Sequence, residues 1–146
     1  MPNKISVGLI EFDSEQYIES VALRDEVLRK PLGFSISLLD IEDDKNQYHI
    51  GATNGETLVG ILLLKVLSTD LVKMRQVAVK PNFQNQGVGK KMVLFSEEFA
   101  KAIGFKTIEL NARKVAVEFY LSQGYHIVSE QFMEVGIPHF KMEKSL

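Results

Sequence analysis

The apolar and polar residues in the middle of the chain form a pattern typical of short antiparallel strands. Residues 47–53 and 56–66 are strand-like, and Asn54-Gly55 between them is a favoured pair for a two-residue hairpin turn. A polar turn at 68–70 leads to a third strand-like segment at 71–80. We therefore expect three antiparallel strands in a meander.

A helical period follows this meander. Apolar residues recur at spacings of three or four between about Gly87 and Ile103, and Gly104 suits the position just after a helix. The expected buried stripe consists of Val88, Met92, Phe95, Phe99 and Ile103. The pattern therefore predicts one long amphipathic helix directly after the third strand.

The flanking segments complete a mixed fold. Asp13 or Ser14 can cap a helix that runs to about Lys30, where Pro31 and Gly33 would end it. Further strands are expected at 5–12, 107–111, 125–129 and 138–143, and a shorter helix at 115–123. Because strand, helix and strand follow one another closely, strands 71–80 and 107–111 should be parallel. We expect a single α/β (α+β) domain over residues 1–146.

Composition narrows the possible functions. The net charge of −2 argues against a general nucleic-acid binder, which would need a broad basic face. The chain has no cysteine, which excludes disulfides, thiolate metal sites and a covalent cysteine intermediate. The three histidines lack metal-ligand spacing, so no metal site is expected. No apolar run approaches membrane-spanning length, and we expect a cytoplasmic protein with no membrane partner.

The turn before the long helix is the most informative segment. Gly87 and Gly89 lie in its first turn, where each helical glycine costs up to about 1 kcal/mol relative to alanine. Lys90 and Lys91 follow, although a helix N-terminus favours acidic residues. No Asp or Glu occurs between Lys73 and Ser96. A helix start of this kind is suited to bind an anion, most plausibly phosphate, on backbone N–H groups.

Two common phosphate motifs do not match this turn. A P-loop would need a glycine at position 82 and a Lys-Ser/Thr pair after Gly87, but these positions hold Asn82 and Val88. A dinucleotide fingerprint would need a third glycine at position 92, which is Met92. Both alternatives therefore fail on spacing.

The pattern that does fit is Gln/Arg-x-x-Gly-x-Gly/Ala, formed by Gln84, Gly87 and Gly89. It resembles the pyrophosphate-binding motif of the GNAT superfamily of acyl-CoA N-acyltransferases, and the order of elements on both sides agrees. Within that superfamily the chain is similar to the ElaA- and YjcF-like bacterial branch. The shared segments are Leu23-Arg24-x-x-Val27-Leu28, Gln76-Val-Ala-Val79, Leu110-Asn111-Ala112, Phe119-Tyr120-x-x-x-Gly124-Tyr125 and Gly136-Ile-Pro-His-Phe140.

This resemblance implies a fold and a reaction. The fold is a mixed, mostly antiparallel sheet of about six to seven strands, splayed between two parallel central strands and flanked by about four helices. The cofactor is acetyl-CoA, whose acetyl group passes to an amine by direct attack in a ternary complex. Tyr120 matches the tyrosine that protonates the leaving thiolate. The residues implied in cofactor binding are Val77, Ala78, Val79, Gln84, Asn85, Gln86, Gly87, Val88, Gly89, Lys90, Asn111 and Phe119.

Several roles stay open at this point. Tyr120 is also compatible with packing at the edge of the core, and Asn111 with capping the next helix. Many relatives carry a carboxylate base on the central strand, but residues 71–80 contain no acid. His49, Asp40 and His139 are candidate bases, and Arg24, His49 and His139 are candidate substrate residues.

The acceptor and the biological role are also open. A small amine, an amino sugar, a peptide N-terminus and a lysine side chain all fit the chemistry. The acidic run at 42–44 is expected to be a solvated loop, or alternatively to attract a cationic amine. The protein is expected to be a monomer or a homodimer. A non-catalytic acyl-CoA-binding or sensor module is the alternative function.

Overall fold

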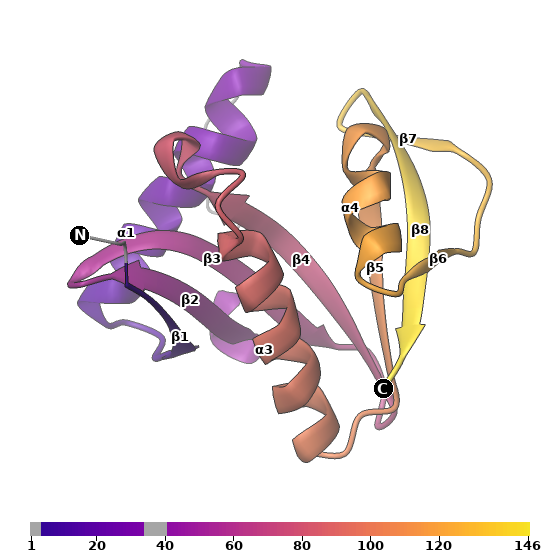
Figure 1. The fold of residues 1–146 in the computed structure, drawn as a ribbon, viewed down its shortest axis with the longest axis horizontal. Helices are drawn as coiled ribbons and strands as arrows, with labels where there is room; N and C mark the ends of the chain where they lie inside the picture. The colour runs from indigo at the N-terminus through magenta and orange to yellow at the C-terminus, as the bar shows by residue number, and fades with distance from the viewer. Residues whose placement is uncertain (1–3, 34–40) are drawn as a thin grey trace. The chain divides into compact units, whose positions relative to one another are not determined.

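The computed structural model describes residues 4–33 and 41–146. The described part contains an eight-stranded sheet with hydrogen-bonded order β1-β2-β3-β4-β5-β8-β6, and β7 pairs with β8 (Figure 1). The strands are β1 (Ile5–Ile10), β2 (Tyr48–Asn54), β3 (Thr57–Val66), β4 (Leu71–Val79), β5 (Thr107–Arg113), β6 (His126–Ile127), β7 (Phe132–Glu134) and β8 (Ile137–Ser145). The described α-helices are α1 (Glu15–Arg24), α3 (Val88–Ala102) and α4 (Val117–Ser122). The predicted mixed, mostly antiparallel class is confirmed.

The chain packs as two compact units. The first comprises residues 1–65 and 76–96, and the second comprises 66–75 and 97–146. The three boundaries fall at the end of β3, within β4 and within α3. No helix of the described residues is long and apolar enough to cross a membrane.

In the first unit β2 and β3 are antiparallel, as predicted, and β1 pairs antiparallel with the other edge of β2. The hairpin turn lies one residue later than expected, because Asn54 still pairs with Thr57 and leaves Gly55 and Glu56 as the loop. Gly55 adopts a φ of 64°, which glycine reaches without steric cost. The register also shifts between Ala52 and Thr53, where Val59 on β3 is the extra residue of a bulge.

The first helix begins as the sequence predicts. The side chain of Ser14, not that of Asp13, caps α1 by accepting a hydrogen bond of 3.1 Å from the N–H of Tyr17. Regular α-helix ends at Arg24, and a π-helical turn (Asp25–Arg29) and a 3-10 turn (Lys30–Leu32) continue the segment. Gly33 ends it with a φ of 81°, as expected.

One face of α1 packs on the sheet of the first unit. The core there consists of Ile10, Tyr17, Leu23, Leu58, Ile61, Leu63 and Ala78. In α3, Val88 and Met92 are buried as predicted, whereas Ile103 lies just beyond the helix and is 47% exposed. The predicted stripe is therefore correct at its start and wrong at its end.

A buried ion pair crosses this core. Arg24 Nη1 lies 2.7 Å from Asp44 Oδ2, and Nη2 lies 3.3 Å from Oδ1, with both side chains fully buried. The hydroxyl of Tyr17 donates to the same carboxylate at 2.7 Å. Burial and this carboxylate raise the pKa of Tyr17 to about 12. The expectation that residues 42–44 form a solvated acidic loop is therefore wrong at Asp44.

The second unit contains the parallel pair. β4 and β5 run parallel from Leu71 opposite Thr107 to Met74 opposite Leu110, as predicted. β8 is antiparallel to β5 along its length, and α4 packs against β5. The sequence prediction missed β7, which pairs with the start of β8 through a two-residue turn at Val135 and Gly136. The sheet therefore has one strand more than the six to seven expected.

We predict that the buried pair is a major source of stability. Asp44→Asn keeps the shape of the side chain but removes the negative charge that lies against the buried Arg24 guanidinium. The free energy of unfolding should fall by about 3–5 kcal/mol, measured by urea denaturation. The control is Lys65→Gln, which breaks the 3.2 Å pair with Asp43, where the side chains are 41% and 45% exposed. That change should cost less than about 1 kcal/mol, and equal losses in both variants would contradict the prediction.

Candidate active site

The loop before α3 has an unusual backbone. After a 3-10 turn (Pro81–Phe83), Asn85 and Gly87 take positive φ values of 62° and 83°, while Gln86 between them does not. Left-handed residues in such a loop can turn nearby N–H groups toward one side, which is the geometry of an anion-binding nest. A Cβ atom added at Gly87 would meet nothing within 4 Å, so the space beside it is open.

Two glutamines hold this loop in shape. The side-chain amide of Gln84 donates to the carbonyl of Val79 at 2.9 Å, and that of Gln86 donates to the carbonyl of Asn82 at 3.0 Å. Gln84 therefore closes the loop onto the end of β4. Its role in the motif can be structural, because its amide engages protein backbone.

The start of α3 is open to an anion. The N–H of Lys91 donates to the carbonyl of Gly87 at 3.0 Å, so this is the first α-helical hydrogen bond. The N–H groups before it belong to the first turn, which has no acceptors within the helix. Residues 84–87 are exposed, as are Lys90 and Lys91, and no acid lies in the first turn. Backbone donors and positive charge thus coincide here, as the sequence predicted.

β4 carries an irregularity just before the loop. Gln76 adopts a φ of 54°, a left-handed conformation that is uncommon for a residue other than glycine. Arg24 Nε donates to Gln76 Oε1 at 2.8 Å and so fixes this side chain to the buried ion pair. The next residues, Val77 and Val79, are half-buried, and Ala78 is buried in the core. The implied cofactor strand therefore begins at a backbone position that tertiary contacts hold.

Tyr120 lies in the second unit on α4. Its ring meets those of Phe119 and Tyr125 edge to face, with centroids 5.0 Å and 5.7 Å apart. The side chain is buried, and this desolvation raises the pKa of Tyr120 to about 12. Tyr120 therefore keeps its proton at neutral pH, which is the state that a general acid needs.

A buried polar group adjoins this aromatic cluster. Burial, and secondly the negative charge of Glu97, raise the pKa of Tyr125. Lys144 Nζ donates to Glu97 Oε1 at 2.8 Å and to the carbonyl of Gln123 at 2.7 Å. The hydroxyl of Tyr125 and Oε2 of Glu97 are buried outside hydrogen-bond geometry. These contacts anchor the end of α4 to β8.

Three polar residues that the sequence did not connect meet on one face of the second unit. The amide of Asn111 donates to Glu134 Oε1 at 3.3 Å, and His139 Nε2 lies 3.4 Å from Glu134 Oε2. Sequence reasoning singled out Asn111 and His139 separately and missed Glu134. The signal for Glu134 was the segment Val135-Gly136, since a two-residue turn there places position 134 on a strand beside β8.

Two other predicted substrate residues are enclosed by protein. Arg24 is fully buried, and its guanidinium contacts Asp44 and Gln76. His49 is buried against Tyr17, and its Nε2 lies 2.7 Å from the carbonyl of Asp44. That Arg24 or His49 contacts the acceptor stays a prediction, and the burial of both side chains gives it no support. Asp40, a candidate base, lies outside the described residues.

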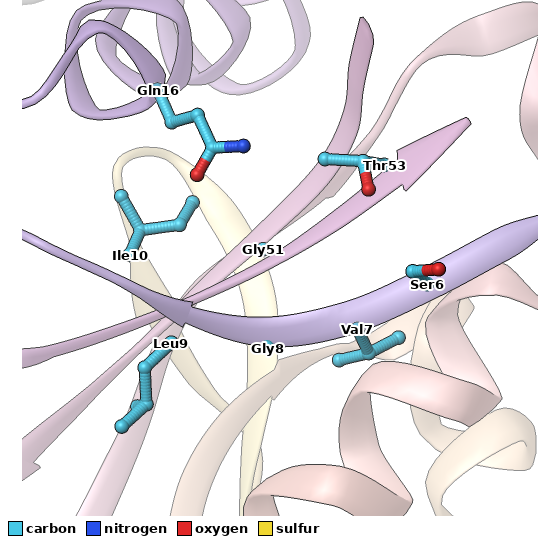
Figure 2. Close-up of a pocket in the computed structure, with 8 residues that line it drawn as sticks. All are labelled: Ser6, Val7, Gly8, Leu9, Ile10, Gln16, Gly51 and Thr53. Atoms are coloured by element: carbon cyan, nitrogen blue, oxygen red, sulfur yellow. The ribbon is translucent and has the colours of Figure 1, made fainter. Parts of the chain in front are cut away.

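A hollow of about 230 Å³ lies at β1 in the first unit. Figure 2 shows that it is lined by β1 together with Gln16 from α1 and with Gly51 and Thr53 from β2. It contains no ionisable side chain, so it offers no acid or base for group transfer. Among residues 4–33 and 41–146, no three His, Asp or Glu side chains are grouped to hold a metal ion.

Comparison with known proteins decides the family. The model of the acetyltransferase (GNAT) domain matches residues 35–146. The chain belongs to the GNAT acetyltransferase family. Its class is therefore that of acyl-CoA-dependent N-acetyltransferases, as the motif predicted.

Two relatives from Bacillus subtilis (strain 168) support this GNAT membership. The uncharacterized N-acetyltransferase YjcF is 29% identical over 94% of this chain and 98% of its own length. The uncharacterized protein YyaT is 35% identical over 51% of this chain, and that match spans only 50% of YyaT. The predicted similarity to YjcF-like proteins is confirmed.

Solved structures share the GNAT fold. A putative N-acetyltransferase from Lactobacillus plantarum superposes with a TM-score of 0.88 at 21% identity, covering 99% of both chains. Escherichia coli ElaA gives 0.83 at 21% identity, covering 97% of this chain and 99% of ElaA. A GNAT acetyltransferase from Elizabethkingia anophelis, with acetyl-CoA bound, gives 0.73 at 17% identity, covering 97% and 98%.

We predict that Tyr120 leaves a signature in alkaline unfolding. The phenol ionises near pH 10 in the unfolded chain but only near pH 12 in the folded protein. Its contribution to stability is therefore complete below pH 10 and falls by roughly 3 kcal/mol as pH rises to 12. Tyr120→Phe should remove this part of the pH dependence, measured by urea denaturation between pH 9 and 12, whereas Tyr48→Phe, at an exposed site, should not. An unchanged slope in Tyr120→Phe would contradict the assignment.

Proposed function

We propose that this chain is an N-acetyltransferase that moves the acetyl group of acetyl-CoA to a primary amine by direct attack in a ternary complex. The observation that carries the proposal is the segment at 84–91, which combines two left-handed residues, an open helix start and two exposed lysines. Membership of the GNAT family supports the class of reaction. The bound acetyl-CoA of the Elizabethkingia anophelis neighbour supports the choice of acyl donor.

The loop suits a diphosphate for a physical reason. A diphosphate needs several donors within a small volume, and backbone N–H groups at a helix start supply them without flexible side chains. In this proposal Gln84, Asn85, Gln86, Gly87, Val88, Gly89 and Lys90 hold the diphosphate of coenzyme A. Val77, Ala78 and Val79 hold the pantetheine arm and the acetyl carbonyl through backbone groups, with Asn111 and Phe119 as further contacts.

The chemistry assigns one role to Tyr120. A neutral amine nitrogen bonds to the thioester carbonyl carbon, the carbon–sulfur bond breaks, and the thiolate takes the proton of the Tyr120 phenol. The pKa of that phenol is about 12, so the proton is present at neutral pH. The desolvation that raises this pKa would also raise the proton affinity of a thiolate formed beside it, which keeps the transfer feasible.

The cellular setting is part of the proposal. We expect a monomer or a homodimer in the cytoplasm, acting on a small-molecule or peptide amine, without nucleic-acid or membrane partners. A non-catalytic acyl-CoA-binding or sensor module is the competing function, because the segment Leu71–Val79 contains no acid to act as base.

An acyl-transfer assay distinguishes the two functions. We expect thiol release from acetyl-CoA with at least one amine of a panel of ethanolamine, glucosamine, trialanine and Nα-acetyl-lysine. Tyr120→Phe should lower kcat about 100-fold while the Kd for coenzyme A stays unchanged, because the phenol acts on the leaving group. Tyr48→Phe is the matched control. Binding of coenzyme A without any amine-dependent release would favour the sensor, and full turnover by Tyr120→Phe would remove its acid role.

Substitution at Gly87 tests the loop. Alanine at a φ of 83° costs about 1 kcal/mol of backbone strain, and its methyl group would enter the open space assigned to the diphosphate. We expect Gly87→Ala to raise the Kd for coenzyme A at least 10-fold in calorimetry. Gly55→Ala is the control, because Gly55 also has a positive φ of 64° and open surroundings. Equal Kd values for both variants would count against this site.

A further inference from the structure

One face of the second unit gathers polar side chains from three strands. β8 lies between β5 and β7, and the register sets His139 opposite Arg113 on one side and opposite Phe132 on the other. Residues directly opposite each other on antiparallel strands point to the same face. Asn111, two residues before Arg113, and Glu134, two residues after Phe132, therefore share this face with His139.

The contacts give Glu134 a fixed position with access to solvent. Its Oε1 accepts from Asn111 Nδ2 at 3.3 Å, and its Oε2 lies 3.4 Å from His139 Nε2. The Glu134 side chain is 47% exposed, whereas that of His139 is 4% exposed. An ionised carboxylate has about four lone-pair sites. Two are directed to protein groups, so the others are available to a ligand.

The tautomer of His139 follows from geometry. His139 Nδ1 lies 2.7 Å from the carbonyl of Ile137, and a carbonyl only accepts, so Nδ1 carries a hydrogen. Nε2 is the ring atom that lies 3.4 Å from Glu134 Oε2. His139 is thus held beside the carboxylate of Glu134, which has lone pairs that can accept a proton.

The backbone is strained where it holds this pair. Val135 and Gly136, which join Glu134 to β8, have φ values of 46° and 74°. Glycine tolerates this turn, but a β-branched residue in the left-handed region is an outlier. Such strain costs roughly 1–3 kcal/mol and persists where surrounding contacts over-determine it, often at functional sites. Phe132 also stacks on the His139 ring at 5.9 Å and limits its movement.

We propose that Glu134 binds the acceptor amine and takes a proton from it, with His139 and Asn111 as positioning residues. This inference rests on the proposed acetyltransferase function. It supplies the carboxylate that the segment Leu71–Val79 lacks. A primary amine reaches the protein as an ammonium ion, which an exposed, oriented carboxylate attracts.

The proton balance is complete. The acceptor nitrogen loses two protons as it changes from ammonium to amide, and Glu134 with His139 passes them on. One is balanced by the proton that the coenzyme A sulfur gains, and one is released to solvent. Other ionisable groups on this face are Arg113 and Glu109 on β5, Lys141 and Glu143 on β8, and His126, which lies opposite Glu143 on β6. Lys141 lies 3.3 Å from the Glu109 carboxylate and is already paired.

The test uses the full chain with acetyl-CoA and the best amine of the panel named above. Glu134→Gln keeps the shape and can still bond to Asn111, but it cannot take the proton. We expect kcat/KM for the amine at pH 7 to fall about 100-fold or more, with an unchanged Kd for coenzyme A. The loss should shrink at alkaline pH, where the amine is already neutral, and Glu134→Asp should restore part of the rate. The control is Glu130→Gln, an exposed glutamate in the preceding loop.

Each outcome has a definite reading. A wild-type protein that transfers acetyl groups while Glu134→Gln keeps kcat/KM and the pH profile within twofold would overturn this inference alone. A wild-type protein without transfer to any amine would overturn the proposed function and this inference with it. A constant loss at all pH values would indicate that Glu134 shapes the site without taking the proton, and would also overturn the inference.

Discussion

The first unit is organised around a buried charge that cannot be left unmatched. The Arg24 side chain is fully buried, and its bidentate contact with Asp44 offsets the free energy cost of removing its charge from water. The same guanidinium reaches Gln76, so one cation connects the end of α1, the segment before β2 and the last part of β4. A left-handed residue inside a strand is unstable alone, and this side-chain bond holds it. The hydrogen bond from the buried Arg24 side chain thus stabilises the irregular backbone of β4 at Gln76.

The two candidate binding elements are built from different groups. The loop before α3 uses backbone N–H groups, which any sequence has, and glycine and lysine serve to expose them and to add charge. The cluster on β5, β7 and β8 uses side chains whose identity is essential. The charge of a diphosphate is distributed over several oxygens, so it can be bound by many weak donors. Transfer of a single proton needs one correctly positioned carboxylate.

Most elements were predictable because their signals are local. The Ser14 cap, the Gly33 stop and the apolar spacing of α3 depend on residues within a few positions of one another. The errors arose where pairing between strands decided the outcome. The pairing of Asn54 with Thr57 moved the hairpin turn by one residue. β7 is only three residues long, and it exists because β8 offers a partner edge.

The sequence by itself determined the family and the prediction of an anion site before α3, because both depend on the order and spacing of residues close in the chain. Only the tertiary structure decided which polar residues work together. Asp44 belongs to an acidic run, yet Arg24, twenty positions earlier, removes it from solvent. Glu134 was not singled out in the sequence, and its proposed role depends on contacts with Asn111 and His139 from two other strands. A site made of backbone groups can be predicted from the spacing of nearby residues. A site made of side chains depends on contacts between distant segments, which only folding brings together.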